Sequence, residues 1–131
     1  MLSPTQTSVG QFCWVDLAAS DVARAKAFYG DMFGWTSREQ TANGGVFSRF
    51  QHAGRDVGSL YQLSLKHLDG GVPSHWTPYI RVDDAEASAC RAVSCGGAVI
   101  VRPFAVPGVA RIALIADAVG AHVGLWESSE R

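Results

Sequence analysis

Residues 12–35 read FCWVDLAASDVARAKAFYGDMFGW, and the spacing of their apolar residues changes in a way that decides the fold. Residues 11–17 form a short segment rich in aromatic and β-branched residues, which is typical of a strand. Ser20 offers an N-cap, and Asp21 places negative charge at a helix start. Apolar residues then recur at helical spacing until Gly34, which stands where a helix ends. The stretch predicts a strand followed by a helix.

The rest of the chain repeats this order. Further strands are predicted at residues 35–40, 46–52, 56–63, 77–82, 98–101, 110–116 and 121–126, with a hairpin turn at 43–45. A second helix is predicted to start at Asp83, with Glu86 three residues later as in a capping box. A shift of 63 residues (84 − 21) places Asp21 on Asp84. Each half therefore predicts the order β-α-β-β-β.

These patterns predict one α+β domain over residues 1–131 built from two modules. The first module covers about residues 11–63 and the second about 77–127. The linker, about 64–76, contains Gly70, Gly71 and Pro73 and few periodic apolar residues. Because each module leaves one sheet face to be covered, the two are expected to pack as one domain.

Composition excludes several classes of protein. Of 131 residues 47% are hydrophobic and 18% charged, as in ordinary globular chains. The net charge of −1 builds no field for nucleic acid or anionic membranes, and no apolar run is long enough for a transmembrane helix. The N-terminus lacks the features of a signal peptide. Three cysteines without a CxxC motif favour a reduced, cytoplasmic protein.

Three segments resemble the vicinal oxygen chelate superfamily, which includes glyoxalases, bleomycin-resistance proteins and dioxygenases. They are the quoted stretch, HWTPYIRVDDAEA at 75–87 and DAVGAHVGLWE at 117–127. The resemblance implies two βαβββ modules packed around a shared cleft, and often a homodimer. It also implies, in the metal-dependent members, four ligands from the first and last strands of the modules, with positions open for substrate oxygens.

The positions that correspond to those ligands carry other residue types here. They are Trp14, Gly58, Thr77 and Gly124. An indole nitrogen only donates, glycine has no side chain, and a lone threonine hydroxyl is a poor ligand. We therefore expect no metal and no other cofactor.

Strand alternation predicts what lines the cleft instead. Gly58 and Leu60 are expected to face the cleft, as are the candidate ligand-binding residues Trp14, Asp16, Tyr79, Arg81, His122 and Trp126. Large aromatic walls with few polar groups are typical of an organic-ligand pocket. The alternative is that the aromatic side chains fill the cleft themselves as core.

Two further residues are weak catalytic candidates. Asp56 and His122 are equivalent by the repeat and could meet across the modules as an acid–base pair, or lie as a polar pair at the rim. The sequence thus favours metal-independent binding of a small aromatic or drug-like molecule, as in bleomycin-resistance proteins. The alternative is a glyoxalase- or dioxygenase-like lyase or oxidoreductase with an atypical metal site. Whether the protein is an enzyme is left open.

Overall fold

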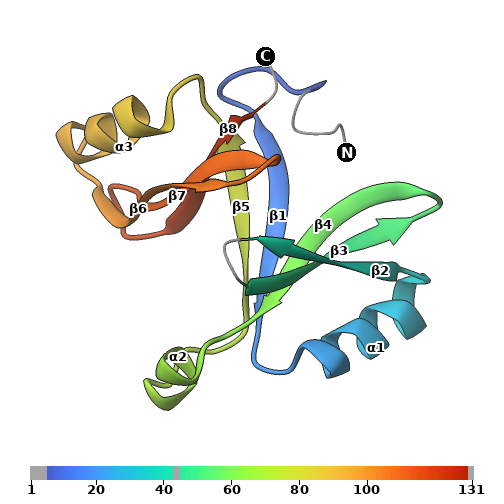
Figure 1. The fold of residues 1–131 in the computed structure, drawn as a ribbon. Coiled ribbons are helices and arrows are strands. Elements are labelled where there is room, and N and C mark those ends of the chain that lie inside the picture. Colours follow the sequence, from blue (N-terminus) through green and yellow to red (C-terminus); the bar gives the residue numbers. More distant parts are fainter. Residues whose placement is uncertain (1–5, 43–44, 130–131) are drawn as a thin grey trace. The chain divides into compact units, whose positions relative to one another are not determined.

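The structure is a computed structural model that describes residues 6–42 and 45–129. The chain divides into two compact units, each of which is considered by itself. The central unit is Val15–Trp76, and the terminal unit is Met1–Trp14 with Thr77–Arg131. Eight strands and three helices lie in the described residues: each half runs β-α-β-β-β, and the remaining helix lies between the halves in sequence (Figure 1). This confirms the predicted α+β class and the two modules, while the shared cleft stays a prediction.

The central unit holds the first module. Its elements are β1 (Phe12–Ala19, of which the first three residues belong to the terminal unit), α1 (Val22–Phe33), β2 (Thr36–Ala42), β3 (Gly45–His52), β4 (Arg55–Gln62) and α2 (Leu65–Asp69). The strands lie in the order β2-β3-β4-β1. The β1–β4 pair is parallel and the other two pairs are antiparallel.

One face of this sheet is covered by α1. Leu17, Phe50 and Leu60 are at most 5% exposed and form a cluster against which Val22 and Tyr29 of α1 pack. The apolar stripe of the helix thus buries the matching alternate residues of β1, β3 and β4. The opposite face of the sheet remains for polar side chains.

The terminal unit holds the second module. Its elements are β5 (His75–Arg81, of which the first two residues belong to the central unit), α3 (Ala85–Ser94), β6 (Ala98–Val106), β7 (Ala110–Ala116) and β8 (His122–Ser128). The strands lie in the order β5-β8-β7-β6, with β5 parallel to β8. Ala89 of α3 packs on Ala113 and Leu125, so α3 covers one face of this sheet.

Both helices begin one residue later than the sequence patterns indicate. Asp21, rather than Ser20, is the N-cap of α1 and accepts a hydrogen bond from the backbone N–H of Arg24. Asp84, rather than Asp83, caps α3 in the same way. In each case the carboxylate accepts from a backbone N–H of the first turn, three residues later, that has no partner within the helix. The two caps occupy equivalent positions in the 63-residue repeat (84 − 21).

Two segments extend the predicted elements. The linker contains the short helix α2, capped by Ser64, whose side chain accepts from the N–H of His67. Strand β6 continues past Pro103 to Val106 with register shifts against β7. A proline is tolerated there because β6 is the last strand of its sheet. The predicted turn residues 43–44 lie outside the described residues. No helix among the described residues is long and apolar enough to cross a membrane.

The position of the α3 cap gives a first prediction. Asp84→Ala should lower the free energy of unfolding by about 1 kcal/mol, because the N–H of Ala87 loses its acceptor. Asp83→Ala is the matched control, since it removes an equal charge one residue away and should change stability by less than about 0.5 kcal/mol. Urea unfolding of the three proteins measures both values. A larger effect at Asp83 would contradict the observed cap.

Candidate functional site

The β5–β8 pairing fixes which side chains share a face in the terminal unit. Tyr79 is aligned with Gly124, and Arg81 with Trp126. Leu125 between them packs with α3. Since alternate residues of a strand point to opposite faces, these four aligned residues lie on the face away from α3. The shared face predicted from strand alternation is therefore confirmed for them.

The ring of Tyr79 lies where a side chain at position 124 would be. A Cβ atom on Gly124 would stand 2.2 Å from Tyr79 Cδ2, far inside any real contact. Gly58 of the central unit is similarly confined, because its Cβ would stand 2.9 Å from the carbonyl oxygen of Val15. Neither position could hold a longer, ligating side chain without a shift of its neighbours.

The four positions expected from the sequence therefore do not fit the metal site that the family resemblance implies. Trp14 and Thr77 are the other two corresponding positions, and both are buried. In the described part of the chain no three His, Cys, Asp or Glu side chains gather closely enough to hold an ion.

Three rings form the aromatic cluster, which is Trp14, Tyr79 and Trp126. They are between 6% and 8% exposed. The Trp14 and Trp126 ring centroids are 5.7 Å apart, and Tyr79 meets Trp126 edge-on at 5.9 Å. These separations suit favourable aromatic pairs. Three of the predicted ligand-binding residues are thus brought together, and they pack against one another.

A polar atom in the aromatic cluster lacks a partner. Among the described residues nothing accepts a hydrogen bond from Trp126 Nε1, although the atom is buried. Ser128 Oγ, two residues along β8 and on the same face, is also buried and unpaired. A buried donor without an acceptor costs about 1–3 kcal/mol. Such a group is an expected feature of a ligand site.

Cys13 and Arg81 lie beside the aromatic cluster. Cys13 is fully buried and packs against its rings. Burial raises the pKa of the Cys13 thiol to about 11, although the nearby charge of Arg81 and a backbone hydrogen bond oppose the shift. A thiol with so high a pKa is a poor nucleophile at neutral pH. The Arg81 guanidinium donates to the carbonyl oxygen of Thr7, which holds the side chain in place.

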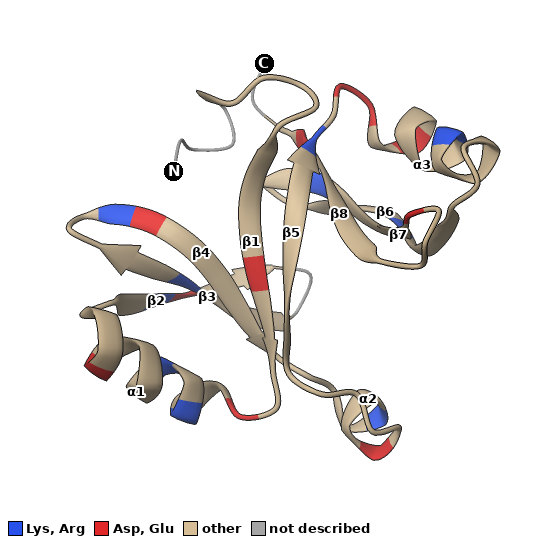
Figure 2. Cartoon of the chain, turned by 180° about the vertical axis from the view of Figure 1, so that it is seen from behind, with Lys and Arg blue, Asp and Glu red and all other residues tan. Residues whose placement is uncertain are grey.

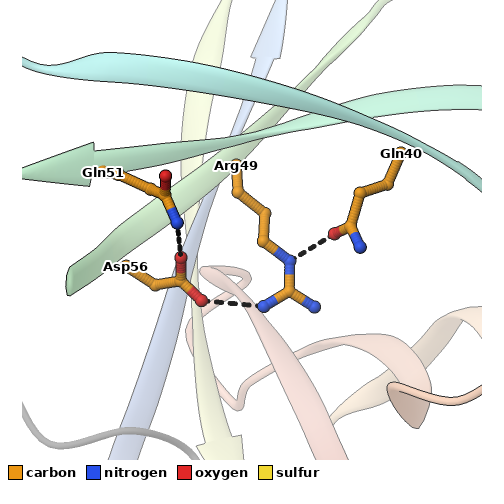
Figure 3. A network of polar contacts seen from close by, with 4 residues as sticks. All are labelled: Gln40, Arg49, Gln51 and Asp56. Carbon is orange, nitrogen blue, oxygen red and sulfur yellow. Dashed lines mark hydrogen bonds and ion pairs between the residues drawn. The ribbon is translucent and has the colours of Figure 1, made fainter. Parts of the chain in front are cut away.

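The two weak catalytic candidates belong to different units. His122 is exposed at the start of β8, where it is aligned with Ala116. Asp56 of β4 is bound on both carboxylate oxygens (Figure 3): Arg49 Nη1 is 2.7 Å from Oδ2, and Gln51 Nε2 is 3.0 Å from Oδ1. Asp56 could act as an acid or base only after its ion pair with Arg49 is broken. A contact between Asp56 and His122 stays a prediction.

The prediction that Gly58 and Leu60 face the cleft with Trp14 is wrong. Leu60 is fully buried in the cluster under α1, and Gly58 is aligned with Phe50, which packs there too. The residue on the other face is Ser59, which the parallel β1–β4 pairing aligns with Asp16. In β4 the residue equivalent to Gly124 is therefore Ser59 and not Gly58, one residue away from the position that the internal repeat predicts.

A β-bulge explains why counting along β4 is misleading. Gly58 is aligned with Phe50, but the next residue of β3, Gln51, is aligned with Asp56. Val57 is therefore an extra residue in β4, and it inverts the alternation on either side. As a result Asp56 shares the face of Ser59 rather than that of Gly58.

Asp16 lies on this polar face and is the only charged residue of β1 (Figure 2). Its Oδ1 accepts a hydrogen bond of 2.8 Å from Ser59 Oγ. Burial raises the pKa of the Asp16 carboxyl to about 6, while the Ser59 hydrogen bond and the nearby His75 oppose the shift. Burial and the charge of Asp16 raise the pKa of Tyr61, so these two residues lie near one another.

The sequence matches one family over most of its length. A family model described as Glyoxalase/Bleomycin resistance protein/Dioxygenase superfamily matches residues 11–124. The putative glyoxylase CFP32 of Mycobacterium tuberculosis (strain CDC 1551 / Oshkosh) is 35% identical over 118 residues, which are 88% of this chain and 45% of that protein. The anthracycline biosynthesis protein DnrV of Streptomyces peucetius is 33% identical over 133 residues, with coverages of 93% and 48%. The chain thus spans about half the length of these relatives.

The fold is also found in solved structures. Methylmalonyl-CoA epimerase from Mycobacterium tuberculosis has a TM-score of 0.67 with 23% identity, and the match covers 98% of this chain and 93% of the epimerase. A hypothetical protein from Bacillus halodurans C-125 has a TM-score of 0.70 with 15% identity, with coverages of 95% and 98%. At these identities the likeness concerns the fold alone.

The contact between Tyr79 and Gly124 predicts a large effect of one methyl group. Gly124→Ala should destabilise the protein by about 1–3 kcal/mol, because the Tyr79 ring must leave its place. Gly45→Ala is the control, since that Cβ would meet only the Ala42 carbonyl oxygen at 3.6 Å. Thermal and urea unfolding measure the difference. The penalty should shrink in a Tyr79→Ala background; an equal penalty there would contradict the overlap.

The raised pKa of Asp16 predicts a pH-dependent stability difference. The folded pKa of about 6 exceeds the ordinary value of 3.8, so Asp16 favours folding below about pH 4 and loses that contribution as the pH rises through 6. Asp16→Asn does not titrate. Its free energy of unfolding should therefore rise relative to the unaltered protein, by roughly 1–3 kcal/mol between pH 4 and 7.

Asp31→Asn is the control for this measurement, because Asp31 is exposed on α1. Urea unfolding at several pH values compares the three proteins. A difference for Asp16→Asn that stays flat with pH, or that Asp31→Asn shares, would contradict the burial of the Asp16 charge.

Proposed function

Because the chain belongs to the Glyoxalase/Bleomycin resistance protein/Dioxygenase superfamily, we propose that it binds a planar aromatic small molecule at the aromatic cluster, without a metal ion. Binding of this kind sequesters the molecule, as in bleomycin-resistance proteins, and needs no reacting group. The observation that carries the proposal is the buried N–H of Trp126, which has no acceptor within the described residues.

A ligand oxygen would supply that acceptor. A carbonyl or quinone oxygen placed against Trp126 Nε1 removes the cost of the unpaired donor, and the same ligand's ring can lie against Trp14 or Tyr79. The ring faces give affinity and the single donor gives orientation, which is the usual division in small-molecule sites. Arg81, held beside the cluster by Thr7, and the exposed His122 are the predicted polar groups of the terminal unit.

The chemistry of a relative supports this class of ligand. DnrV, 33% identical to this chain, is named for the biosynthesis of anthracyclines, which are flat polycyclic aromatic compounds. The alternative is a lyase or oxidoreductase with an atypical metal site, for which the described residues offer no donor set. A homodimer and a cytoplasmic location also stay predictions.

The proposal predicts binding of alizarin, a planar dihydroxyanthraquinone. Titration should quench tryptophan fluorescence with saturation, and isothermal calorimetry should give the dissociation constant. Trp126→Phe keeps a ring and removes the donor, so it should weaken binding about twofold to twelvefold, the equivalent of one hydrogen bond. Trp126→Phe should stay folded, because removal of the unpaired donor offsets part of the cost of the smaller ring, and thermal unfolding separates loss of binding from loss of fold.

Trp35→Phe is the matched control. Trp35 packs with Tyr29 and Phe50 under α1, so its replacement should leave alizarin binding unchanged. Unchanged affinity in Trp126→Phe would overturn the assigned donor. Binding that appears only after addition of a divalent metal would favour the enzymatic alternative.

A further inference from the structure

Asp16 of the central unit is a half-buried carboxylate that forms no ion pair within the described residues. Ser59 is the single hydrogen-bond donor to it among the described residues, and it occupies only Oδ1. No described Lys, Arg or His nitrogen lies within ion-pair distance of Asp16. Buried charges in proteins are normally paired, because desolvation penalises an isolated ion. The missing counter-ion is the observation that needs an explanation.

We propose that Asp16 anchors a binding site for a primary alkylammonium group. The ammonium would approach the second carboxylate oxygen and complete the ion pair. This site is on the central unit and does not depend on the aromatic cluster, so the two proposals can fail separately. It also goes beyond that proposal, because it assigns a positive charge to a ligand of this protein.

The surroundings of Asp16 suit an ammonium group. Ser59 fixes the carboxylate from one side by a bond of 2.8 Å. Tyr61, two residues further along β4 and on the same face, lies near enough for the Asp16 charge to raise the pKa of its hydroxyl. A protonated tyrosine offers an oxygen that can accept from an N–H and a ring face that attracts cations. An ammonium, with three donors, can use both residues at once.

The cationic side chains nearest in the fold are committed elsewhere or exposed. Arg49, aligned with Ser59 on β3, donates to Gln40 and forms an ion pair with Asp56. Arg38 on β2 lies one strand further from Asp16. His75 is exposed, and its Nδ1 is 2.9 Å from the Pro73 carbonyl oxygen. Among the described residues His75 is near enough to act on the Asp16 charge, but no cation forms an ion pair with it, which leaves the carboxylate able to bind a ligand.

A metal ion is a poor candidate for the same position. A stable cation site needs several oxygen ligands around the ion, and the second carboxylate of this face, Asp56, is bound by Arg49 and Gln51. An organic ammonium needs only one carboxylate and a hydrogen-bond acceptor. The raised pKa of Asp16 agrees with this assignment, because desolvation of the charge outweighs the hydrogen bond from Ser59 and the effect of the nearby His75.

Cyclohexylamine tests the proposal, because it is a primary amine without an aromatic ring. Binding is followed by heteronuclear NMR on the 15N-labelled full chain. The Asp16, Ser59 and Tyr61 amides should shift with saturation at pH 7.5. At pH 5 the amine stays charged but about nine-tenths of Asp16 is protonated, so affinity should fall about tenfold. Near pH 6, binding should release protons, which calorimetry in buffers of different ionisation enthalpy measures.

Three comparisons decide the outcome. Asp16→Asn should lose binding at least tenfold, whereas Asp31→Asn removes the same charge from α1 and should bind normally. Cyclohexanol, the neutral analogue, should bind at least tenfold more weakly. The Asp16→Asn protein is expected to be as stable as the unaltered one at pH 7, so lost binding would not reflect unfolding. Equal binding of cyclohexanol, or retained binding in Asp16→Asn, would overturn the proposal.

Discussion

The overlap between the Tyr79 ring and the position above Gly124 constrains the rest of the terminal unit. Parallel pairing of β5 and β8 sets these two residues side by side, and the glycine is needed because the ring occupies the space of a side chain. Once the ring lies there, Trp126 packs against its edge and Trp14 against Trp126. A position at which the family resemblance implies a metal ligand is thereby occupied by aromatic packing. The pair of Tyr79 and Gly124 thus places an aromatic ring where a side chain of residue 124 would otherwise lie.

The central unit reaches a different result with the same topology. Its parallel pair, β1 and β4, aligns Asp16 with Ser59, so the face away from the helix carries a hydrogen-bonded carboxylate instead of rings. The bulge at Val57 then turns Asp56 onto that face, where Arg49 neutralises it. Two units with one fold therefore present opposite chemistry, one aromatic and one polar. The fold alone would not reveal this, because function depends on the residues placed on it.

The limits of prediction from the sequence follow from these particulars. Strand and helix order was predictable because each change of hydrophobic period is long and is bounded by a cap or glycine. The shared face of Tyr79, Arg81, Gly124 and Trp126 was also predictable, because β5 and β8 alternate regularly. The face of Gly58 and Leu60 was not predictable, because the extra residue of the bulge, Val57, cannot be recognised from the residue types around it. The hydrogen bond between Asp16 and Ser59 depends on pairing between strands more than forty residues apart in the chain.

Two groups in the molecule contradict the usual rule that buried polar groups are satisfied. The Trp126 N–H lacks an acceptor and the Asp16 carboxylate lacks a cation, each within the described residues. If both positions served packing alone, phenylalanine would avoid the unpaired indole donor and asparagine would avoid the desolvated charge. Natural chains depart from local consistency mainly where a function requires it. The two departures differ in chemistry, since a donor seeks an acceptor and an anion seeks a cation. Together they describe ligands with a carbonyl-bearing aromatic ring or an ammonium group, and each unit contributes one of the two requirements.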